Sequence, residues 1–416
     1  MTRSLLISLK TSSDLVSKLA FFAVTVMAAR ALSAEEFGAF SVAWTLGWLL
    51  GLASDMGLQV HLAREVARDP LSATATCRTL LPARLAGATV AALVVVAVGI
   101  VSLPLDRAVA FSLIVVAQIC GSLIEFFNYF FRGLSRSDVE SSVNVAHRGA
   151  VLFLAWLLLA SAGGLESLAI ALVVPAAVTL VFVAQLALSS RDARGPRPDP
   201  QVSWAGFRRD VLPIGLGVLL SALYFRVDLF LVQQWVGDGA AGLYNAVFRL
   251  IEALRLFPAA VLAVMFPQLC RTRDARLLRR MSIHLGAAGL ALAAAVYWAA
   301  PAIVQMFYGS RYLGAVGAFR ILTLALPLLF VNYALTHQLI AWNLQRAYAV
   351  ICGLSLAGNL AVNALWIPRF GIEGAAWCTL LTELTLASAC TLVLLHRGMA
   401  AAEPAATGLA VPASQG

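Results

Sequence analysis

The chain has 416 residues, of which 61% are hydrophobic and 12% are charged, and its mean hydropathy is +0.86. Soluble domains have about 45–50% apolar and about 25% charged residues, so the composition excludes a soluble globular protein and predicts a polytopic membrane protein. The net charge of +9 comes from basic residues in short gaps between apolar runs. That pattern is typical of membrane topology and not of nucleic-acid binding.

Twelve apolar segments approach or exceed the length of about 20 residues that a helix needs to cross a bilayer. The first six are Ser12–Leu32, Gly38–Ala63, Pro82–Leu103, Ala108–Phe131, Asn144–Ala162 and Ser167–Leu188. The fifth of these carries His147 and Arg148 near its start. The second six are Val211–Val236, Ala241–Pro267, Ile283–Phe307, Gly314–Trp342, Ala347–Ile367 and Ile372–Leu395. The sequence therefore predicts an all-α integral membrane fold.

Arginines set the predicted orientation of these segments. They cluster in the gaps after even-numbered segments, as at Arg191 and Arg194, whereas the gaps after odd-numbered segments hold one each at Arg107, Arg311 and Arg369. Positive residues mark cytoplasmic loops, so both termini are predicted to be cytoplasmic. The predicted outer loops are only a few residues long, which excludes a large catalytic domain on the outer side.

The longest polar stretch, residues 189–209, contains the sequence GPRPDP and follows six predicted helices. It predicts a cytoplasmic linker over 191–209 between a six-helix bundle at 1–190 and a second at 210–398. The tail, residues 399–416, is rich in Ala, Pro, Gly and Ser and is predicted to be disordered.

Two short matches suggest that the halves are repeats. Gly38 aligns with Gly242, each two residues before an aromatic side chain, and Gly164 aligns with Gly371 at almost the same offset. A repeat of six helices keeps its orientation in the membrane, so the halves would be related by an axis along the membrane normal. A transport cavity would lie between them.

The seventh and eighth segments carry charges inside apolar sequence, where ionisable groups are costly and mark functional sites. Asn245, Arg249 and Glu252 are spaced i, i+4 and i+7, so they share one face of a helix. Arg226 lies at a similar depth in the seventh segment. Because arginine stays charged and grips phosphate oxygens in a fork, these residues predict a hydrated, net-positive cavity in the C-terminal half that binds an anionic head group.

Further charges extend this candidate site. Arg255 and Arg320 are assigned to head-group binding, with snorkelling or helix capping as the alternative. Asp228 and Glu252 are candidates for coupling to a proton or a sodium ion. The charges also allow a purely structural interpretation, in which they form two ion pairs that hold helices together: Arg249 with Glu252 and Arg226 with Asp228.

The N-terminal half has its own acids, Asp55 and Glu125, near the inner ends of the second and fourth segments. Both are candidate cavity residues, and Asp55 has the structural alternative of pairing with Arg64 or His61. The sequence holds no P-loop, no nucleophile motif, no CxxC pair and no cluster of metal-ligating residues. It therefore predicts a protein that is not an enzyme and has no metal or other cofactor.

Four runs of sequence resemble a known family in order and spacing. The pattern AR-x-L-x-x-x-x-[FY]-G ends at Gly38, and Arg226-x-Asp228 is followed by GLYNAVFRL over residues 242–250. The other two are residues 301–312 with FYG, and Asn359-x-x-x-Asn363 leading to PRFGIEGAA over residues 368–376. Together they resemble the polysaccharide biosynthesis, O-antigen-type flippases of lipid-linked oligosaccharides, in the multidrug/oligosaccharidyl-lipid/polysaccharide exporter superfamily.

The resemblance implies two six-helix bundles arranged as a V around a central cavity. It also implies alternating-access flipping of undecaprenyl-pyrophosphate-linked oligosaccharide across the inner (cytoplasmic) membrane, and Arg226, Asp228 and Arg249 match its motif positions. The implied partners are the lipid-linked glycan, membrane lipids, and a polymerase or glycosyltransferases of the same pathway.

Three other functions stay open. A cation-coupled multidrug or metabolite exporter and a peptidoglycan-precursor flippase share the architecture. A membrane glycosyltransferase, polymerase or ligase would act on the same substrate, but such enzymes need sizeable outer loops, which the sequence lacks.

Overall fold

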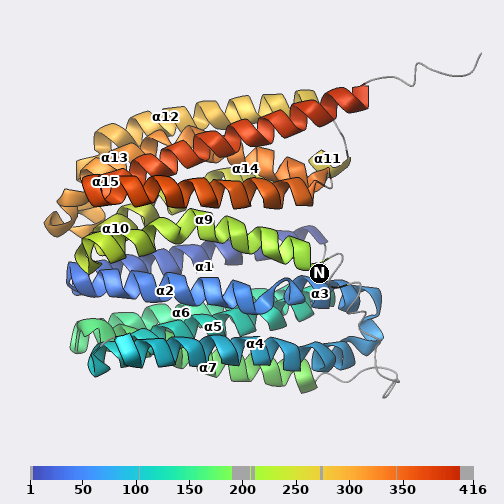
Figure 1. The fold of residues 1–416 in the computed structure, drawn as a ribbon. Coiled ribbons are helices and arrows are strands. Elements are labelled where there is room, and N and C mark those ends of the chain that lie inside the picture. The colour runs from blue at the N-terminus through green and yellow to red at the C-terminus, as the bar shows by residue number, and fades with distance from the viewer. Residues whose placement is uncertain are drawn as a thin grey trace, which may run out of the picture.

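The computed structural model describes residues 3–102, 104–189, 207, 211–271, 275–342 and 344–402, and within them the chain is helical without strands (Figure 1). The first half of the chain forms α1 (Arg3–Ala31), α2 (Ala34–Asp55), α3 (Leu58–Arg68), η1 (Pro70–Ser72), α4 (Ala73–Ser102), α5 (Leu105–Gly133), α6 (Ser137–Ser161) and α7 (Gly164–Ser189). The second half forms α9 (Leu212–Val236), α10 (Asp238–Leu254), α11 (Leu256–Arg271), α12 (Ala275–Tyr308), η3 (Ser310–Ala315), α13 (Val316–Leu324), α14 (Leu326–Ala341) and α15 (Gln345–Ala402).

Nine helices in the described ranges are long and apolar enough to cross a membrane. The number rises to ten if the bent pair Ser310–Leu324 (η3 and α13) and Leu326–Ala341 (α14) forms one span. The twelve predicted segments all fall on helices, but twelve spans are not confirmed. The predicted eighth segment is divided into α10 and α11 at Arg255. The last two predicted segments lie in α15, where Gly371 has non-helical dihedral angles of φ 56° and ψ −137°.

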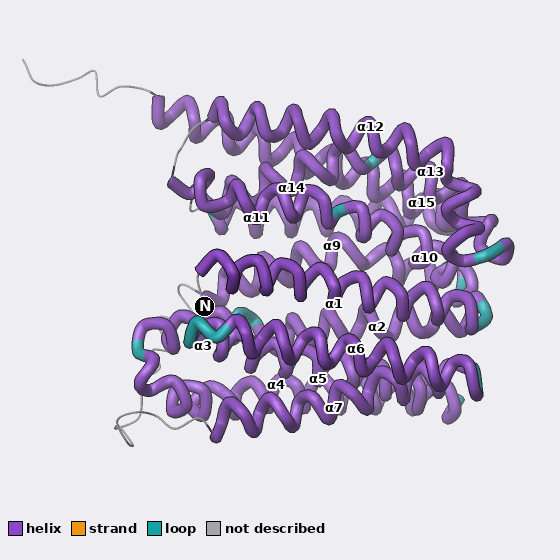
Figure 2. Tube along the Cα trace, turned by 180° about the vertical axis from the view of Figure 1, so that it is seen from behind, coloured by secondary structure: helices purple, strands orange, loops and turns teal. Residues whose placement is uncertain are grey.

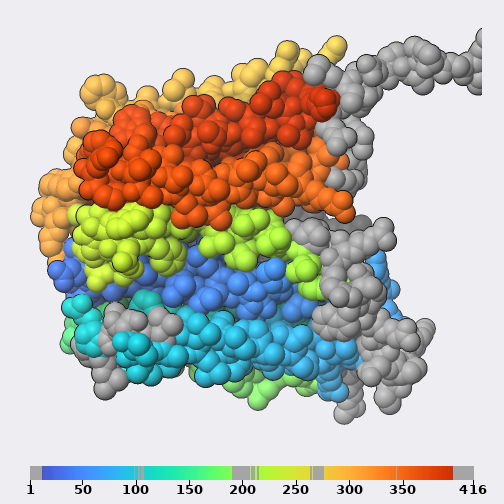
Figure 3. All heavy atoms as spheres, viewed as in Figure 1, coloured from blue at the N-terminus to red at the C-terminus, as the bar shows by residue number. Residues whose placement is uncertain are grey.

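The chain reverses direction at Gly371. A Cβ built on Gly374 would lie 2.7 Å from the carbonyl oxygen of Trp366, and the Asn359 amide donates to the Thr382 hydroxyl, 3.0 Å away. The two arms of α15 therefore lie side by side. Figure 3 shows α15, in orange and red, against α9, in green.

Helices α1–α7 lie on one side of the molecule and α11–α15 on the other, with α9 and α10 beside α2 (Figure 1). From behind, α1 runs against α6 (Figure 2). We refer to α1–α7 as the N-terminal half and to α9–α15 as the C-terminal half. The predicted linker lies outside the described residues apart from Phe207, as does the tail from residue 403 onward; the V shape stays a prediction.

The two halves meet at equivalent positions of α2 and α10. A Cβ on Gly38 would lie 2.7 Å from the carbonyl carbon of Asp238, and one on Gly242 would lie 3.0 Å from the Gly38 nitrogen. One turn further along, the Asn245 amide donates to the Ser41 hydroxyl, 2.8 Å away and 204 residues apart in sequence. Only glycine permits so close an approach of two helix backbones, so the pair of glycines aligned in the sequence marks the crossing point.

Two arginines tie the halves together beside this crossing. Arg30, at the end of α1, donates to the carbonyl oxygens of Phe307, 2.7 Å away, and of Met306, at the end of α12. In return, Arg311 donates to the carbonyl oxygen of Arg30, 2.8 Å away. Each cation therefore satisfies carbonyls that a helix C-terminus leaves unpaired.

Candidate functional site

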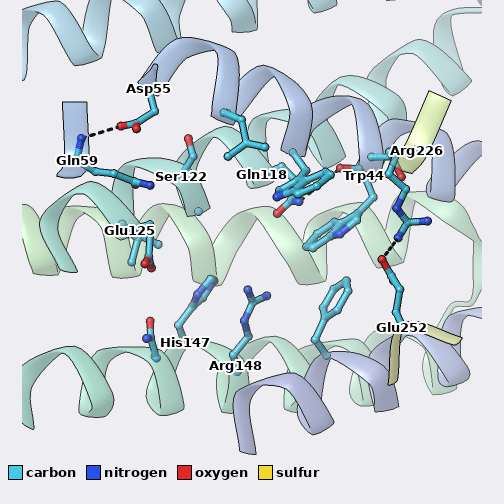
Figure 4. Close-up of a pocket in the computed structure, with 18 of the residues that line it drawn as sticks. Trp44, Asp55, Gln59, Gln118, Ser122, Glu125, His147, Arg148, Arg226 and Glu252 are labelled. Atoms are coloured by element: carbon cyan, nitrogen blue, oxygen red, sulfur yellow. Dashed lines mark hydrogen bonds and ion pairs between the residues drawn. The ribbon is translucent and has the colours of Figure 1, made fainter. Parts of the chain in front are cut away.

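A pocket of about 360 Å³, here called the central pocket, lies among α1, α2, α4, α5 and α6, with α9 and α10 at one end (Figure 4). Only three of its lining residues come from the C-terminal half: Arg226, Arg249 and Glu252. The other lining residues are Phe21, Trp44, Thr45, Trp48, Gly51, Leu52, Asp55, Gln59, Arg84, Gln118, Gly121, Ser122, Ile124, Glu125, Asn144, His147 and Arg148. The pocket is therefore mostly in the N-terminal half, whereas the sequence placed the cavity in the C-terminal half.

Helical spacing explains why these side chains converge. Gln118, Ser122 and Glu125 are spaced i, i+4 and i+7 on α5, so they point to one side of the helix. Trp44 and Asp55 lie on one face of α2 in the same way, eleven residues apart. Helix α5 thus presents a polar stripe to the pocket, and α2 presents Trp44 and Asp55 to the same space.

At one end of the pocket Glu252 bridges two arginines. Its Oε1 lies 2.6 Å from Arg226 and its Oε2 lies 2.7 Å from Arg249. Arg226 is further held by Asn245, whose Oδ1 lies 3.2 Å away, and by the ring of Phe248. The sharing of one helix face by Asn245, Arg249 and Glu252 is thus found, and so is the ion pair between Arg249 and Glu252.

These two arginines differ in access to the pocket. The Arg226 side chain is 4% exposed and the Arg249 side chain 14%. A third cation, Arg148 of α6, lies with its guanidinium 5.3 Å from the Phe21 ring centre, and Arg249 lies 5.7 Å from the same ring. We call this region of Arg148, Arg226, Arg249 and Glu252 the cationic end. It holds three positive charges against one negative charge.

The opposite end of the pocket is built on Arg84 of α4. Its guanidinium is fully buried and lies 3.5 Å from Asp55, and it donates to the hydroxyls of Ser54 at 2.6 Å and Ser122 at 2.7 Å. Asp55 also accepts from the backbone nitrogen of Gln59, 3.2 Å away, and so caps the start of α3. Its partner is therefore Arg84, not Arg64 or His61, and the sequence analysis missed Arg84.

The pocket lining also carries four polar side chains, Gln118, Glu125, Asn144 and His147, which we call the polar wall. Asn128 joins two of these residues, because its amide donates to Glu125 at 3.2 Å and to Asn144 at 2.9 Å. The His147 ring points into the pocket. His147 was noted in the sequence only as a polar residue near the start of a segment, and the amides were given no role, because uncharged polar residues are common inside helix bundles.

Three candidate residues lie elsewhere. Asp228 is buried, accepts from the hydroxyls of Tyr244 and of Thr379, the latter 3.4 Å away, and does not pair with Arg226. Arg255 lies 4.1 Å from the Phe225 ring centre, in a neighbouring groove that shares Trp48, Leu52 and Glu252 with the central pocket. Arg320 donates to the carbonyl oxygen of Tyr297, 3.3 Å away in the interior of α12 and four residues before Pro301, so it neither lines the pocket nor caps a helix end.

An apolar groove of about 570 Å³ adjoins the cationic end; we call it the lateral groove. It runs between α1 of the N-terminal half and α10, α12 and α13 of the C-terminal half. It shares Phe21, Arg148, Arg249 and Glu252 with the central pocket. Its other lining residues are Ser17, Lys18, Leu19, Phe22, Thr25, Leu250, Ala253, Leu254, Leu256, Val296, Ile303, Phe307 and Phe319. An amphipathic molecule can therefore place an apolar part in the groove and a polar part in the pocket.

No group of three or more His, Cys, Asp or Glu side chains within the described ranges is arranged to hold a metal ion. The site consists of fixed charges, amides and aromatic rings. Such a set binds and orients a ligand.

A family model described as polysaccharide biosynthesis protein matches residues 7–273. No curated protein sequence matches the chain. Among solved structures, an inward-facing multidrug resistance MATE family transporter of the MOP superfamily is 14% identical, covers 94% of this chain and 96% of its own, and has a TM-score of 0.73. An outward-facing conformation of such a transporter is also 14% identical, covers 93% and 96%, and has a TM-score of 0.59. The lipid II flippase MurJ, in an inward closed conformation, is 13% identical, covers 93% and 87%, and has a TM-score of 0.67.

Proposed function

Because this chain belongs to the polysaccharide biosynthesis protein family, we propose that it is a flippase that carries undecaprenyl-pyrophosphate-linked oligosaccharide across the inner membrane. The fold is that of MOP-superfamily transporters and of a lipid flippase. Alternating access would expose the bound head group first to one side of the membrane and then to the other.

The observation that carries this proposal is the junction of the central pocket with the lateral groove. Arg148 and Arg249 line both. A polyprenyl pyrophosphate has an apolar tail joined directly to two phosphates. The isoprene units next to the phosphates can lie in the groove while the rest of the tail stays in the bilayer. The phosphates then lie beside two arginines with Arg226 behind them, where forked, charge-assisted hydrogen bonds are strongest.

Glu252 makes the cationic end adjustable. It holds Arg226 and Arg249 through separate oxygens, and an arriving phosphate competes with it for Arg249. Protonation of Glu252 would release the arginine to the phosphate, so Glu252 is our first candidate for proton coupling. Asp228, whose carboxylate meets two hydroxyls and a backbone nitrogen, is the candidate for binding a proton or a sodium ion away from the substrate.

A deletion strain tests the proposal. Surface glycan and the leaflet distribution of the undecaprenyl-linked intermediate are measured, with plasmid-borne wild type, Arg249→Ala and Arg369→Ala as complements; Arg369 is an exposed arginine outside the pocket. The proposal is supported if the deletion removes surface glycan and leaves the intermediate on the inner leaflet. It also requires that wild type and Arg369→Ala restore surface glycan and that Arg249→Ala does not. Normal surface glycan with altered drug or metabolite accumulation would instead support an exporter.

A peptidoglycan-precursor flippase would be revealed by a deletion that cannot be obtained without a complementing copy. In the proposed pathway the chain's partners are the lipid-linked glycan, membrane lipids, and a polymerase or glycosyltransferases that act on the same lipid carrier. Both termini are expected on the cytoplasmic side.

A further inference from the structure

We propose that the polar wall of the central pocket is a subsite for the sugar next to the phosphates, and that it selects an uncharged sugar against an acidic one. This inference rests on the proposed function. The residues that we assign to the subsite are Gln118, Glu125, Asn144 and His147, with Trp44 and Trp48 as the aromatic surface.

The order of surfaces along the site carries the argument. The lateral groove is apolar, and the cationic end joins it to the central pocket. His147 and Glu125 of the polar wall lie on the far side of Arg148 from Glu252 (Figure 4). A lipid-linked glycan has its parts in the same order: apolar chain, phosphates, sugar. Once the phosphates contact Arg249, the sugar attached to them extends toward the wall that carries Glu125 and His147.

The chemistry of the wall suits a sugar. Pockets for small ligands combine aromatic surface with a few well-placed polar groups. Trp44 is stacked on Phe21 with ring centres 4.5 Å apart, which fixes its orientation, and Trp48 is 38% exposed. A pyranose ring places C–H groups against such faces and directs its hydroxyls to side chains that both donate and accept, as amides and imidazole do.

These polar groups keep hydrogen-bonding capacity directed at the pocket. Asn144 uses its oxygen to accept from Asn128, which leaves its amide hydrogens for a ligand. Gln118 uses its nitrogen in a long contact of 3.4 Å to the Trp44 carbonyl oxygen, which leaves its oxygen as an acceptor. The volume of about 360 Å³ is at the lower end of the range for ligand pockets, about 300–1,000 Å³, so the subsite has room for one sugar next to the phosphates, not for a whole oligosaccharide.

Charge gives the subsite its selectivity. Arg84 is neutralised by Asp55 and is fully buried, so it offers little attraction to an anion. Glu125 is 40% exposed, and Arg132, 3.4 Å away, lies closer to Glu140. In the proposed function the phosphates engage Arg148, the cation beside His147 (Figure 4), so the Glu125 carboxylate, which also accepts from Arg132 and Asn128, is the charge left to face the sugar. A uronate at this position would meet a like charge, whereas a hexose or N-acetylhexosamine would donate hydroxyl or amide hydrogens to it.

Binding of short-chain analogues to the purified full-length protein tests the inference. The probes are farnesyl diphosphate, farnesyl diphosphoglucose and farnesyl diphosphoglucuronate, measured by calorimetry in detergent. We expect glucose to improve affinity over the bare diphosphate by about tenfold, which two or three hydrogen bonds can provide, and glucuronate to bind at least about tenfold more weakly than glucose.

Variants then locate the effect. Asn144→Ala and His147→Ala should each reduce the ratio of glucose-probe affinity to bare-diphosphate affinity by about threefold to tenfold. Glu125→Gln, which keeps size and shape, should remove most of the preference for glucose over glucuronate. Gln234→Ala, an exposed glutamine on α9, is the matched control and should change neither ratio. Melting temperatures identify any variant that is misfolded. If an alanine variant is misfolded, the isosteric Glu125→Gln variant tests the subsite in its place.

The outcomes separate the two proposals. If farnesyl diphosphate binds but the sugar adds no affinity, or if Glu125→Gln leaves the glucose-to-glucuronate ratio unchanged, the sugar subsite is wrong while the flippase proposal stands. If no farnesyl diphosphate probe binds, the proposed function fails and the subsite fails with it.

Discussion

Replacing Gly242 by alanine should open the contact between the two halves of the protein. A Cβ at this position would overlap the carbonyl oxygen of Ala34 and lie 3.0 Å from the nitrogen of Gly38. Both are backbone atoms, so no side chain can rotate away and α2 and α10 must separate. Overpacking of this kind costs about 1–3 kcal/mol. That cost falls only on the state in which the helices touch, so the ratio of separated to touching molecules should rise by about 5- to 150-fold.

Distances between spin labels measure this ratio. Labels at Ala162 and Leu313, both accessible and both at the end of the molecule where α2 meets α10, report separation after the six native cysteines are replaced. Gly358→Ala is the matched control, because it is also a helical glycine and a Cβ there would meet nothing within 4 Å. It should leave the distance distribution unchanged and raise helix stability by up to about 1 kcal/mol.

A longer distance in Gly242→Ala, absent from the wild type and from Gly358→Ala, is the predicted result. If Gly242→Ala gives the same distance distribution and melting temperature as the wild type, the two helices do not touch at these glycines, and their close approach plays no part in closing the protein.

Two further predictions concern the arginines that the sequence analysis did not assign. Arg84→Ala leaves Asp55 buried without its cation and should destabilise the protein by about 3–5 kcal/mol, seen as a lower melting temperature in detergent. Arg78→Ala on the same helix, which removes an exposed contact to the Leu188 carbonyl oxygen, should have little effect, and equal losses would contradict the assignment. Arg30→Ala and Arg311→Ala should each lower the free energy of unfolding by about 0.3–1 kcal/mol. In a double-mutant cycle the double variant should lose less free energy than the sum of the two single losses. Strict additivity would show that the contacts are independent.

The sequence predicted the helices well because hydrophobicity is a strong local signal. Segments such as Ala108–Phe131 differ from the observed α5 by only a few residues at each end. The number of spans was harder. The break at Gly371 falls between the last two predicted segments, but the break at Arg255, three residues before Pro258, falls inside the predicted eighth segment.

The candidate site was predicted in part. The spacing of Asn245, Arg249 and Glu252 placed them on one face, and they do meet Arg226 there. Which charges pair across helices is not encoded in local spacing, so the structural interpretation paired Arg226 with Asp228, whereas Arg226 pairs with Glu252. The position of the pocket depends on how the N-terminal helices pack, and the amides that line it resemble ordinary buried polar residues in the sequence.

The polar wall was missed for the same reason. Asn144 and His147 lie in the fifth predicted segment, where His147 was noted only, with Arg148, as a polar residue near the start of the segment. Their significance comes from the residues opposite them on α2 and α5, which only the three-dimensional structure reveals.

The most direct test of the account is translocation by purified protein in liposomes. Fluorescent undecaprenyl-pyrophosphate oligosaccharide is placed in both leaflets, and its access to an external quencher or glycosidase is followed over time. We predict rapid exchange between leaflets with the wild type and with Arg369→Ala, and loss of at least about 90% of that rate with Arg249→Ala, because one charge-assisted hydrogen bond is worth about 1.5–3 kcal/mol. Equal rates for Arg249→Ala and the wild type, with equal amounts of folded protein, would contradict the claim that the cationic end binds the pyrophosphate of the transported lipid.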